Sequence, residues 1–363
     1  MRAEGDFVYW QEYSCLAACS HRAVHKLLRD RNFGREQPQS NPPAHLQTFY
    51  ALEANSMLER EAPLHTRLRK LVLHAFTTRR IKSLAPEIER LCHALLDEIQ
   101  APQFDLLQAY ATPLPVRIIA RLLGVPESAA TDLLAWSHAM VGMYQANRTR
   151  AMEDEAEAAA KAFQTFLRNY IVKRRRAPKD DLLSHLIKAE EDGERLSENE
   201  TISTCILLLN AGHEATVHTM GNGVAALLGN NIRRSDAGVV EEVLRYDPPL
   251  HLFMRWCHTS TTVFEHRFEP SDQVALLLGS ANRDASVFAK ADRFDPTRAS
   301  GSLVSFGGGV HFCLGHALAR LELDIGLKVL FDRMPDLRLA GDPHYKLAYH
   351  FHGLETLMVS RGF

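Results

Sequence analysis

The 363-residue chain lacks several features that would place a protein in a simple class. Its six cysteines, at positions 15, 19, 92, 205, 257 and 313, form no Cys-x-x-Cys pair and have no zinc-site spacing. Scattered cysteines of this kind argue against disulfides and favour a reducing, cytoplasmic location. The first 40 residues contain no long apolar run, so the sequence predicts neither a secretion signal nor a membrane anchor.

The chain also lacks an excess of either charge, with 42 Lys and Arg against 44 Asp and Glu. This balance gives no reason to expect nucleic acid as a partner. The one basic run, Lys173 to Arg176, follows an alanine-rich helical pattern and predicts a solvated helix end. With 46% apolar residues, the chain is long enough to bury a large core.

A glycine-rich stretch near the C-terminus, Phe306 to Gly315, reads FGGGVHFCLG. Three consecutive glycines predict a loop, because regular structure costs glycine too much entropy. The following residues, Ala317 to Leu323, predict a helix with apolar residues on one face. Cys313 is therefore expected near a helix N-terminus, where free amides and the helix dipole favour a thiolate.

Three other kinds of loop fit this stretch less well. A phosphate-binding loop would end in Gly-Lys-Ser/Thr, and a dinucleotide fingerprint would need a small residue where Phe312 stands. A lone structural cysteine does not account for the flanking phenylalanines, the histidine and the glycines. An axial thiolate ligand to haem iron uses every residue: the glycines let the backbone approach the macrocycle, Phe306 and Phe312 exclude water, and His311 can reach a propionate.

The stretch resembles the signature Phe-Gly-x-Gly-x-His-x-Cys-x-Gly of the cytochrome P450 family, without gap or substitution. The resemblance runs from about residue 7 to the C-terminus, with an N-terminus shorter than is usual in the family. It implies a single-domain, mainly α protein with minor β-sheets. It also implies haem b (iron protoporphyrin IX) as cofactor, with Cys313 as the axial ligand of the iron and Phe306, Gly307, His311 and Gly315 in the haem site.

A second unusual stretch, Ile202 to Leu228, has 27 residues and a single formal charge, Glu214. As a helix it would be about 40 Å long. Its several polar residues make a transmembrane span costly. A zinc-protease helix needs histidines four apart, whereas His213 and His218 are five apart.

Within this helix, the segment Ala211-Gly212-His213-Glu214-Ala215-Thr216 resembles the oxygen-binding motif of the P450 family, Ala/Gly-Gly-x-acid-Thr. The resemblance implies that Ala211 and Gly212 leave room for dioxygen and that Glu214 relays protons. Ala215 stands where the family usually has an alcohol, and Thr216 lies about 100° further round the helix. We therefore expect an ordered water or a polar group of the substrate to steer the proton.

Other segments complete the resemblance. His65 and Arg69, one helical turn apart, and Arg255 resemble haem-propionate ligands of the family. Glu242 and Arg245 resemble its buried structural Glu-x-x-Arg pair. The residues that would line the substrate pocket are Leu250, His251, Leu252, Tyr349 and Phe351.

The pattern also predicts secondary structure along the chain. We expect two short strands at 7–10 and 15–19, a short helix at 23–28, and helices over 127–195 with a loop near Pro178. Further strands are expected at 250–255 and 273–278, and a terminal hairpin at 346–359.

The resemblance implies a soluble monooxygenase that inserts one oxygen atom from O2 into a small or medium organic substrate. The sequence has no flavin fingerprint and no clustered cysteines, so the electrons would come from separate ferredoxin and ferredoxin reductase chains, docking near Arg69, Lys70 and Arg320. Two alternatives stay open. One is peroxide-driven oxidation, against which Glu214 argues, because peroxide users in the family generally lack the acid. The other is a non-catalytic haem-binding protein, for which His213 is the candidate second iron ligand.

Overall fold

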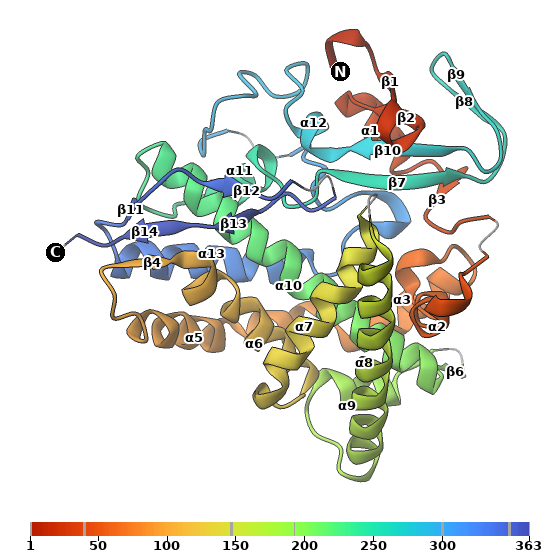
Figure 1. Cartoon of the computed structure of the whole chain (residues 1–363), viewed down its shortest axis with the longest axis horizontal. Helices are drawn as coiled ribbons and strands as arrows, with labels where there is room; N and C mark the ends of the chain where they lie inside the picture. The colour runs from red at the N-terminus through yellow and green to blue at the C-terminus, as the bar shows by residue number, and fades with distance from the viewer. Residues whose placement is uncertain are drawn as a thin grey trace. The chain divides into compact units, whose positions relative to one another are not determined.

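The computed structural model describes residues 2–38, 41–145, 148–191, 193–298, 301–347 and 350–362. The chain divides into two compact units, each assembled from separate stretches of sequence. The first comprises Met1–Phe33, Ile81–Pro115 and Glu214–Phe363, and the second Gly34–Arg80 and Val116–His213. Helices and small sheets make up both units (Figure 1), which confirms the predicted mainly α fold class.

Most strands belong to the first unit. Its helices are α1 (His21–Leu27), α5 (Ala85–Asp97), α11 (Val239–Tyr246), α12 (Leu278–Asn282) and α13 (His316–Arg333). Its strands are β1 (Phe7–Trp10), β2 (Cys15–Ala18), β4 (Gln103–Asp105), β7 (Leu252–Cys257), β8 (Thr261–Val263), β9 (His266–Phe268), β10 (Gln273–Leu277), β11 (Arg338–Leu339), β12 (His344–Tyr345), β13 (Leu354–Thr356) and β14 (Met358–Ser360). The short strand β3 (Phe33–Gly34) lies at the boundary of the two units, and α4 (Thr78–Ser83), α6 (Pro113–Leu123) and α10 (Glu198–Gly229) run from one unit into the other.

The main sheet of the first unit has the strand order β1-β2-β10-β7-β3. Strand β10 pairs parallel to β2 and antiparallel to β7, with Val274 opposite both Leu16 and Arg255. Successive side chains point to opposite faces of a strand. Val274 therefore packs in one hydrophobic cluster with α1, while Ala275 packs in another that contains Leu252. The strands predicted at 7–10, 15–19 and 273–278 are confirmed, each within one residue.

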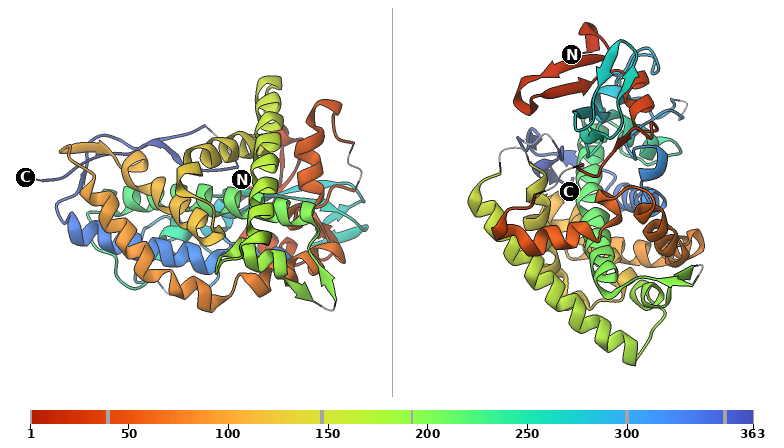
Figure 2. Two further views of the ribbon diagram at one scale, coloured as in Figure 1. Left: turned by 90° about the horizontal axis from the view of Figure 1, so that it is seen from below. Right: turned by 90° about the vertical axis from the view of Figure 1, so that its right-hand side faces the viewer.

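Two further features of the first unit concern the C-terminal region. Helix α13 lies beside α5, as both views of Figure 2 show. The predicted terminal hairpin is confirmed only in part: β12 pairs with β13, but β14 pairs with β4 and β11 in a separate sheet. The reason lies at Asp105, whose side chain accepts a hydrogen bond from the backbone N–H of Leu357 (3.0 Å) and so draws the chain away from β12.

The second unit is almost entirely helical. Its helices are α2 (Gln47–Ala54), α3 (Leu64–Ala75), α7 (Ala130–Val141), α8 (Arg150–Arg176) and α9 (Leu182–Lys188), with a small hairpin of β5 (Glu190–Glu191) and β6 (Glu194–Arg195). Helix α7 packs along α8 through Trp136, whose ring lies 5.3 Å from that of Phe163. The helices predicted over 127–195 are confirmed, but the β5–β6 hairpin was not predicted. Gly193, with φ +80°, supplies its tight turn.

The basic run at the end of α8 differs from the prediction of a solvated helix end. Arg174 is 8% exposed and pairs with Asp181 (Nε to Oδ2, 2.6 Å). It also donates to the carbonyl oxygen of Gly124 at 2.6 Å. The helical period places Arg174 on the same inward face as Leu167 and Ile171, so it is buried although its neighbours in the run are exposed.

The long apolar helix is confirmed as α10, four residues longer at its start than the apolar run. Ser197 and Glu200 explain the start. The Glu200 N–H donates to the Ser197 hydroxyl (3.2 Å), and the Glu200 carboxylate accepts from the Ser197 N–H (2.8 Å). These reciprocal bonds form a capping box, which satisfies amides that the helix leaves open. Among the described residues, no helix is both long and apolar enough to cross a bilayer.

Candidate functional site

The loop around Cys313 lies in the first unit, between a short 3-10 turn at Gly309–His311 and the start of α13. The Cys313 N–H donates to the carbonyl oxygen of Phe306 at 3.0 Å, which closes the loop. Gly309 has φ +64°, and a Cβ there would lie 2.5 Å from the carbonyl oxygen of Leu28. Only glycine fits this position without strain, so the sequence of the loop follows from its geometry.

Aromatic rings surround the loop. Phe306 and Phe312 lie 6.4 Å apart in an edge-on arrangement, and Phe312 lies 4.9 Å from the His316 ring. The Arg320 guanidinium covers the Phe306 ring at 4.4 Å and pairs with Glu241 at 3.1 Å. His311 and Gly315 are half-buried in the same segment.

The other five cysteines differ from Cys313 in exposure. All five are buried, whereas Cys313 is half-exposed. Burial raises the pKa of Cys92 to about 11 and that of Cys205 to about 12. Such thiols stay protonated at neutral pH, so Cys313 is the cysteine best placed to act as a thiolate ligand.

Helix α10 has one accessible face. Ala211 is exposed and Gly212 and Ala215 are half-buried, whereas most of the helix is buried. These residues share a side of the helix, since positions three and four apart are neighbours. Small side chains at these positions let other groups approach the helix closely, as Ile119 does at Gly212, where a Cβ would lie 3.1 Å from the Ile119 Cγ1.

Glu214 is 6% exposed and lies one turn before His218, with 3.5 Å between its Oε2 and the His218 Nε2. Thr216 is also buried, at 4% exposure. The hydroxyl of Thr219 donates to the carbonyl oxygen of Ala215 at 2.6 Å, so this alcohol is bonded to the helix backbone. The acid of the predicted motif is therefore buried, with a histidine beside it.

Arg255 on β7 is 2% exposed, with its guanidinium 5.6 Å from the centre of the Phe253 ring. The same ring packs against the Cys313 loop, because a Cβ on Gly307 would lie 3.2 Å from the Phe253 Cε2. A buried cation therefore stands on the strand that touches the cysteine loop.

The Glu242–Arg245 pair is buried, as predicted. Two bonds of 2.7 Å join the carboxylate and the guanidinium. Arg245 also donates to the carbonyl oxygens of Asn282 (2.9 Å) and Ala291 (2.8 Å). This network fastens the irregular segment after β10 to α11, which is a structural role.

The residues expected to line a pocket lie in different surroundings. Leu250 and Phe351 face each other in an isolated β-bridge. Leu252 is 2% exposed and packs in the core of the main sheet. The His251 ring stacks on that of His352, and burial, with a smaller effect of His352, lowers the pKa of His251 to about 4. Tyr349 lies outside the described residues.

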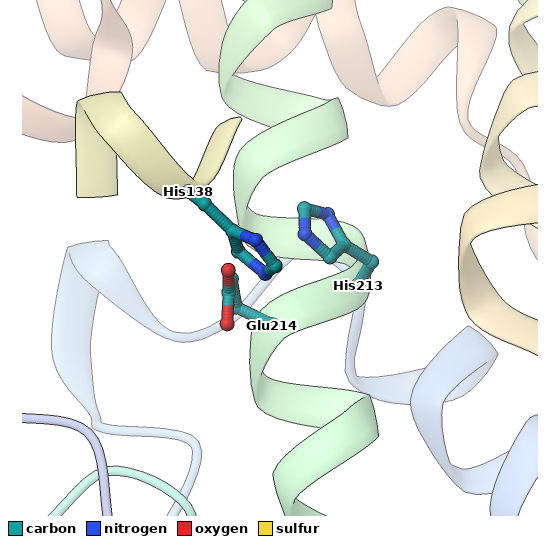
Figure 3. A group of neighbouring side chains, drawn as sticks. All are labelled: His138, His213 and Glu214. Atoms are coloured by element: carbon teal, nitrogen blue, oxygen red, sulfur yellow. The ribbon is translucent and has the colours of Figure 1, made fainter. Parts of the chain in front are cut away.

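In the second unit, His65 is 2% exposed and Arg69 is half-buried one turn further along α3. The ring centres of His138 on α7 and His213 on α10 lie 5.8 Å apart. Figure 3 shows these two side chains with that of Glu214, the next residue of α10. His213 Nδ1 is 2.7 Å from the carbonyl oxygen of Leu209. His138 was not singled out from the sequence, since nothing in its spacing marks it.

Comparison with known proteins decides the family. A sequence model of the cytochrome P450 family matches residues 7–231 and 237–334. The chain belongs to the cytochrome P450 family. It is therefore an oxidoreductase of the monooxygenase type that binds haem b.

This P450 is similar to bacterial P450s of known sequence and structure. It is 42% identical over 321 residues to cytochrome P450 107B1 of Saccharopolyspora erythraea, covering 84% of this chain and 77% of that protein. It is 35% identical over 319 residues to 6-deoxyerythronolide B hydroxylase of the same organism, covering 84% and 78%. The structure of P450BioI with an acyl carrier protein loaded with hexadec-9Z-enoic acid matches at a TM-score of 0.94, with 34% identity and coverage of 99% and 96%.

The residues of the P450 fit the haem that the family carries. The first unit offers a half-exposed thiol in a glycine loop and a buried arginine on the adjoining strand, and helix α10 carries the small residues Ala211, Gly212 and Ala215. A cysteine ligand for the iron and cations for the propionates are the features that such a macrocycle requires.

Proposed function

We propose that this P450 inserts one oxygen atom from O2 into a small or medium organic molecule, with electrons from a separate ferredoxin and its reductase. We further propose that its two units belong to one haem-thiolate domain, because the family match runs over both. The observation that carries the proposal is Cys313, the half-exposed thiol in the glycine loop. Bound haem supplies the activation of dioxygen; the protein supplies position, protons and shielding from water.

We assign the axial thiolate to Cys313, with Phe306 and Phe312 as its shield from water. His65, Arg69, Arg255 and His311 are the proposed partners of the propionates. The assignment of Arg255 is supported by its place on β7, the strand whose Phe253 ring packs against the Cys313 loop.

Glu214 is the proposed proton donor of the site. An acid that is 6% exposed, with His218 Nε2 at 3.5 Å, is placed to pass a proton along one turn of α10. Ala211 and Gly212 would leave room for dioxygen, and Ala215 presents no hydroxyl. In place of an alcohol at position 215, a water or a polar group of the substrate would steer the proton. Thr216, the next residue, is buried.

The redox partner is proposed to be a ferredoxin that meets exposed Lys70 on α3. Arg320 is a weaker candidate for this contact than the sequence suggested, because Glu241 already neutralises it. Acyl chains on a carrier protein should be tested as substrates together with free acids, because the structure of the similar P450BioI contains an acyl carrier protein that bears a fatty acid.

The test is the absorption spectrum of the dithionite-reduced, carbon monoxide-bound protein. We expect a strongly red-shifted Soret band that Cys313→Ser abolishes. Cys257→Ser is the matched control, because Cys257 is buried and its Sγ lies 3.2 Å from the carbonyl oxygen of Thr259, which a hydroxyl can still reach. A band at the position of histidine-ligated haem in the wild type would overturn the proposal.

Two alternative functions can be distinguished from the proposed one by turnover with peroxide and by the consumption of dioxygen. Peroxide-driven turnover without reductant would favour the peroxide enzyme over the ferredoxin-dependent one. A haem carrier would consume no dioxygen and would need a second iron ligand. The candidate for that ligand, His213, has Nδ1 bonded to the Leu209 carbonyl and its ring beside His138, which favours the catalytic function.

A further inference from the structure

A cluster of metal-ligating side chains lies in the first unit apart from the cysteine loop. Asp247 ends α11, His251 follows four residues later, and His352 precedes β13. The Nε2 of His352 is 3.0 Å from the Asp247 Oδ1, and the Nε2 of His251 is 3.9 Å from the same oxygen. All three residues are half-buried, so the cluster is neither sealed nor fully solvated.

The backbone holds the two segments that carry these side chains together. The His352 N–H donates to the carbonyl oxygen of Pro249 (2.8 Å), and the His251 N–H to that of His350 (3.2 Å). The fully buried side chain of Asn222 donates to the carbonyl oxygens of Asp247 (3.4 Å) and His352 (3.0 Å). The three side chains therefore start from one preorganised frame, although they are far apart in sequence.

We propose that Asp247, His251 and His352 form a site for a divalent transition-metal ion, with Zn²⁺ as the best match. One donor atom from each residue lies within 4.8 Å of the others. Donor atoms this close together can share one ion once a histidine ring has turned, because zinc–ligand distances in proteins are about 2.0–2.1 Å. Two imidazoles and one carboxylate suit zinc better than calcium or magnesium, which prefer oxygen ligands.

Tyr345 supports the carboxylate from the outside. Its hydroxyl donates to the Asp247 Oδ2 at 2.8 Å, which leaves Oδ1 turned toward the two histidines. Such outer contacts orient a metal ligand and commonly change metal affinity by about 10–100-fold. With three protein ligands, the fourth position of a tetrahedral ion is left to water.

The rings must rearrange to bind the ion. His352 is stacked on His251 (centres 4.0 Å apart, planes 14° apart) and on Tyr345 (4.4 Å, 13°). Imidazole lone pairs lie in the ring plane, so two stacked rings cannot both direct a lone pair at one ion, and one ring has to turn about its Cβ–Cγ bond. His251 is the one that turns, because its side chain is 36% exposed whereas that of His352 is 22% exposed.

The consequence is a metal link between the end of α11 and the C-terminal hairpin of β12 and β13. None of the three ligands is among the residues proposed to hold the haem, and one of them, His251, was predicted to line the substrate pocket. The ion would therefore stabilise the hairpin, and its loss would leave Cys313 and the haem in place.

The test is zinc binding by the full-length holoprotein, made without a histidine tag and treated with a chelator. Isothermal titration should give one Zn²⁺ per chain, and zinc X-ray absorption should show nitrogen and oxygen ligands at about 2.0–2.1 Å with histidine scattering. His352→Ala and Asp247→Asn should each weaken binding by about ten-fold or more. The haem spectrum and melting temperature report whether each variant is folded, and His251→Ala replaces any that is not.

Two control variants keep the result specific. His344→Ala removes an exposed histidine of the same hairpin, and His138→Ala removes a histidine of the second unit that lies beside His213. Both should bind zinc as the wild type does. No saturable binding, equal binding by the wild type and the ligand variants, or loss of binding in His138→Ala alone would overturn the proposal.

Discussion

The buried carboxyl of Glu322 on α13 makes the stability of this P450 depend on pH. Glu322 is 1% exposed, and neither carboxyl oxygen has a hydrogen-bond partner among the described residues. Burial raises the pKa of Glu322 well above its ordinary value of 4.5. The folded protein therefore keeps this proton at pH values where the carboxyl of the unfolded chain releases it.

The sign follows from proton linkage. Above about pH 4.5 the folded state binds more protons than the unfolded state at this residue, so stability is greatest at low pH and falls as the pH rises. Between the pKa of the unfolded chain and the raised pKa of the folded protein, the loss is at most about 1.4 kcal/mol for each pH unit. Glu322→Gln has no proton to release and removes this dependence.

The assay is the melting temperature of the holoprotein as a function of pH. We expect Glu322→Gln to melt above the wild type near neutral pH and the difference to shrink toward pH 5. Asp324→Asn, which neutralises an exposed carboxyl on the same helix, is the matched control and should follow the wild type. Parallel curves for Glu322→Gln and the wild type would refute the reasoning.

Three other predictions concern particular residues. Arg245→Ala removes the partner that makes two 2.7 Å bonds to buried Glu242 and leaves it only Arg298 at 3.4 Å and the Asp295 N–H. It should lower the free energy of unfolding by about 3–5 kcal/mol, against at most about 1 kcal/mol for Arg234→Ala, which breaks an exposed pair with Asp236. Similar losses for the two variants in denaturant titrations would contradict this prediction. Gly309→Ala should lower the free energy of unfolding by about 1–3 kcal/mol and lower the haem content measured by absorbance, because Gly309 has φ +64° and a Cβ there would meet the Leu28 carbonyl oxygen. Gly229→Ala is the control: its Cβ meets nothing, so both quantities should stay unchanged. Ala215→Thr should change the fraction of reductant recovered as product; an unchanged fraction with the true substrate would contradict the role given to the missing hydroxyl.

Local sequence alone predicted the parts of the molecule whose structure depends on neighbours in the chain. The three glycines before Cys313 and the apolar pattern after it predicted a loop followed by a helix, and α13 begins at His316. The long apolar run predicted α10, and the spacing of Glu242 and Arg245 predicted their ion pair. In each case the physical cause is backbone freedom or helical period, which a short stretch of sequence records.

Long-range contacts decided the rest. The sequence predicted Arg174 to be solvated, but Asp181 and the Gly124 carbonyl bind it in the folded protein. Strand β14 lies outside the predicted hairpin, where Asp105 accepts a hydrogen bond from the residue before it. The start of α10 was missed for another reason, since Ser197 and Glu200 are polar and lie outside the apolar run.

The metal-ligating cluster of Asp247, His251 and His352 is the feature that the sequence alone was least able to predict. Asp247 and His352 are distant in sequence, and neither spacing nor composition relates them. They meet because Asn222 and the backbone bonds of Pro249 and His350 bring two segments into register. Sequence thus determined the family, the cysteine loop and the long helix, where the chemistry is written in consecutive residues. Tertiary structure alone decided which distant polar groups face one another, because that depends on how the elements pack.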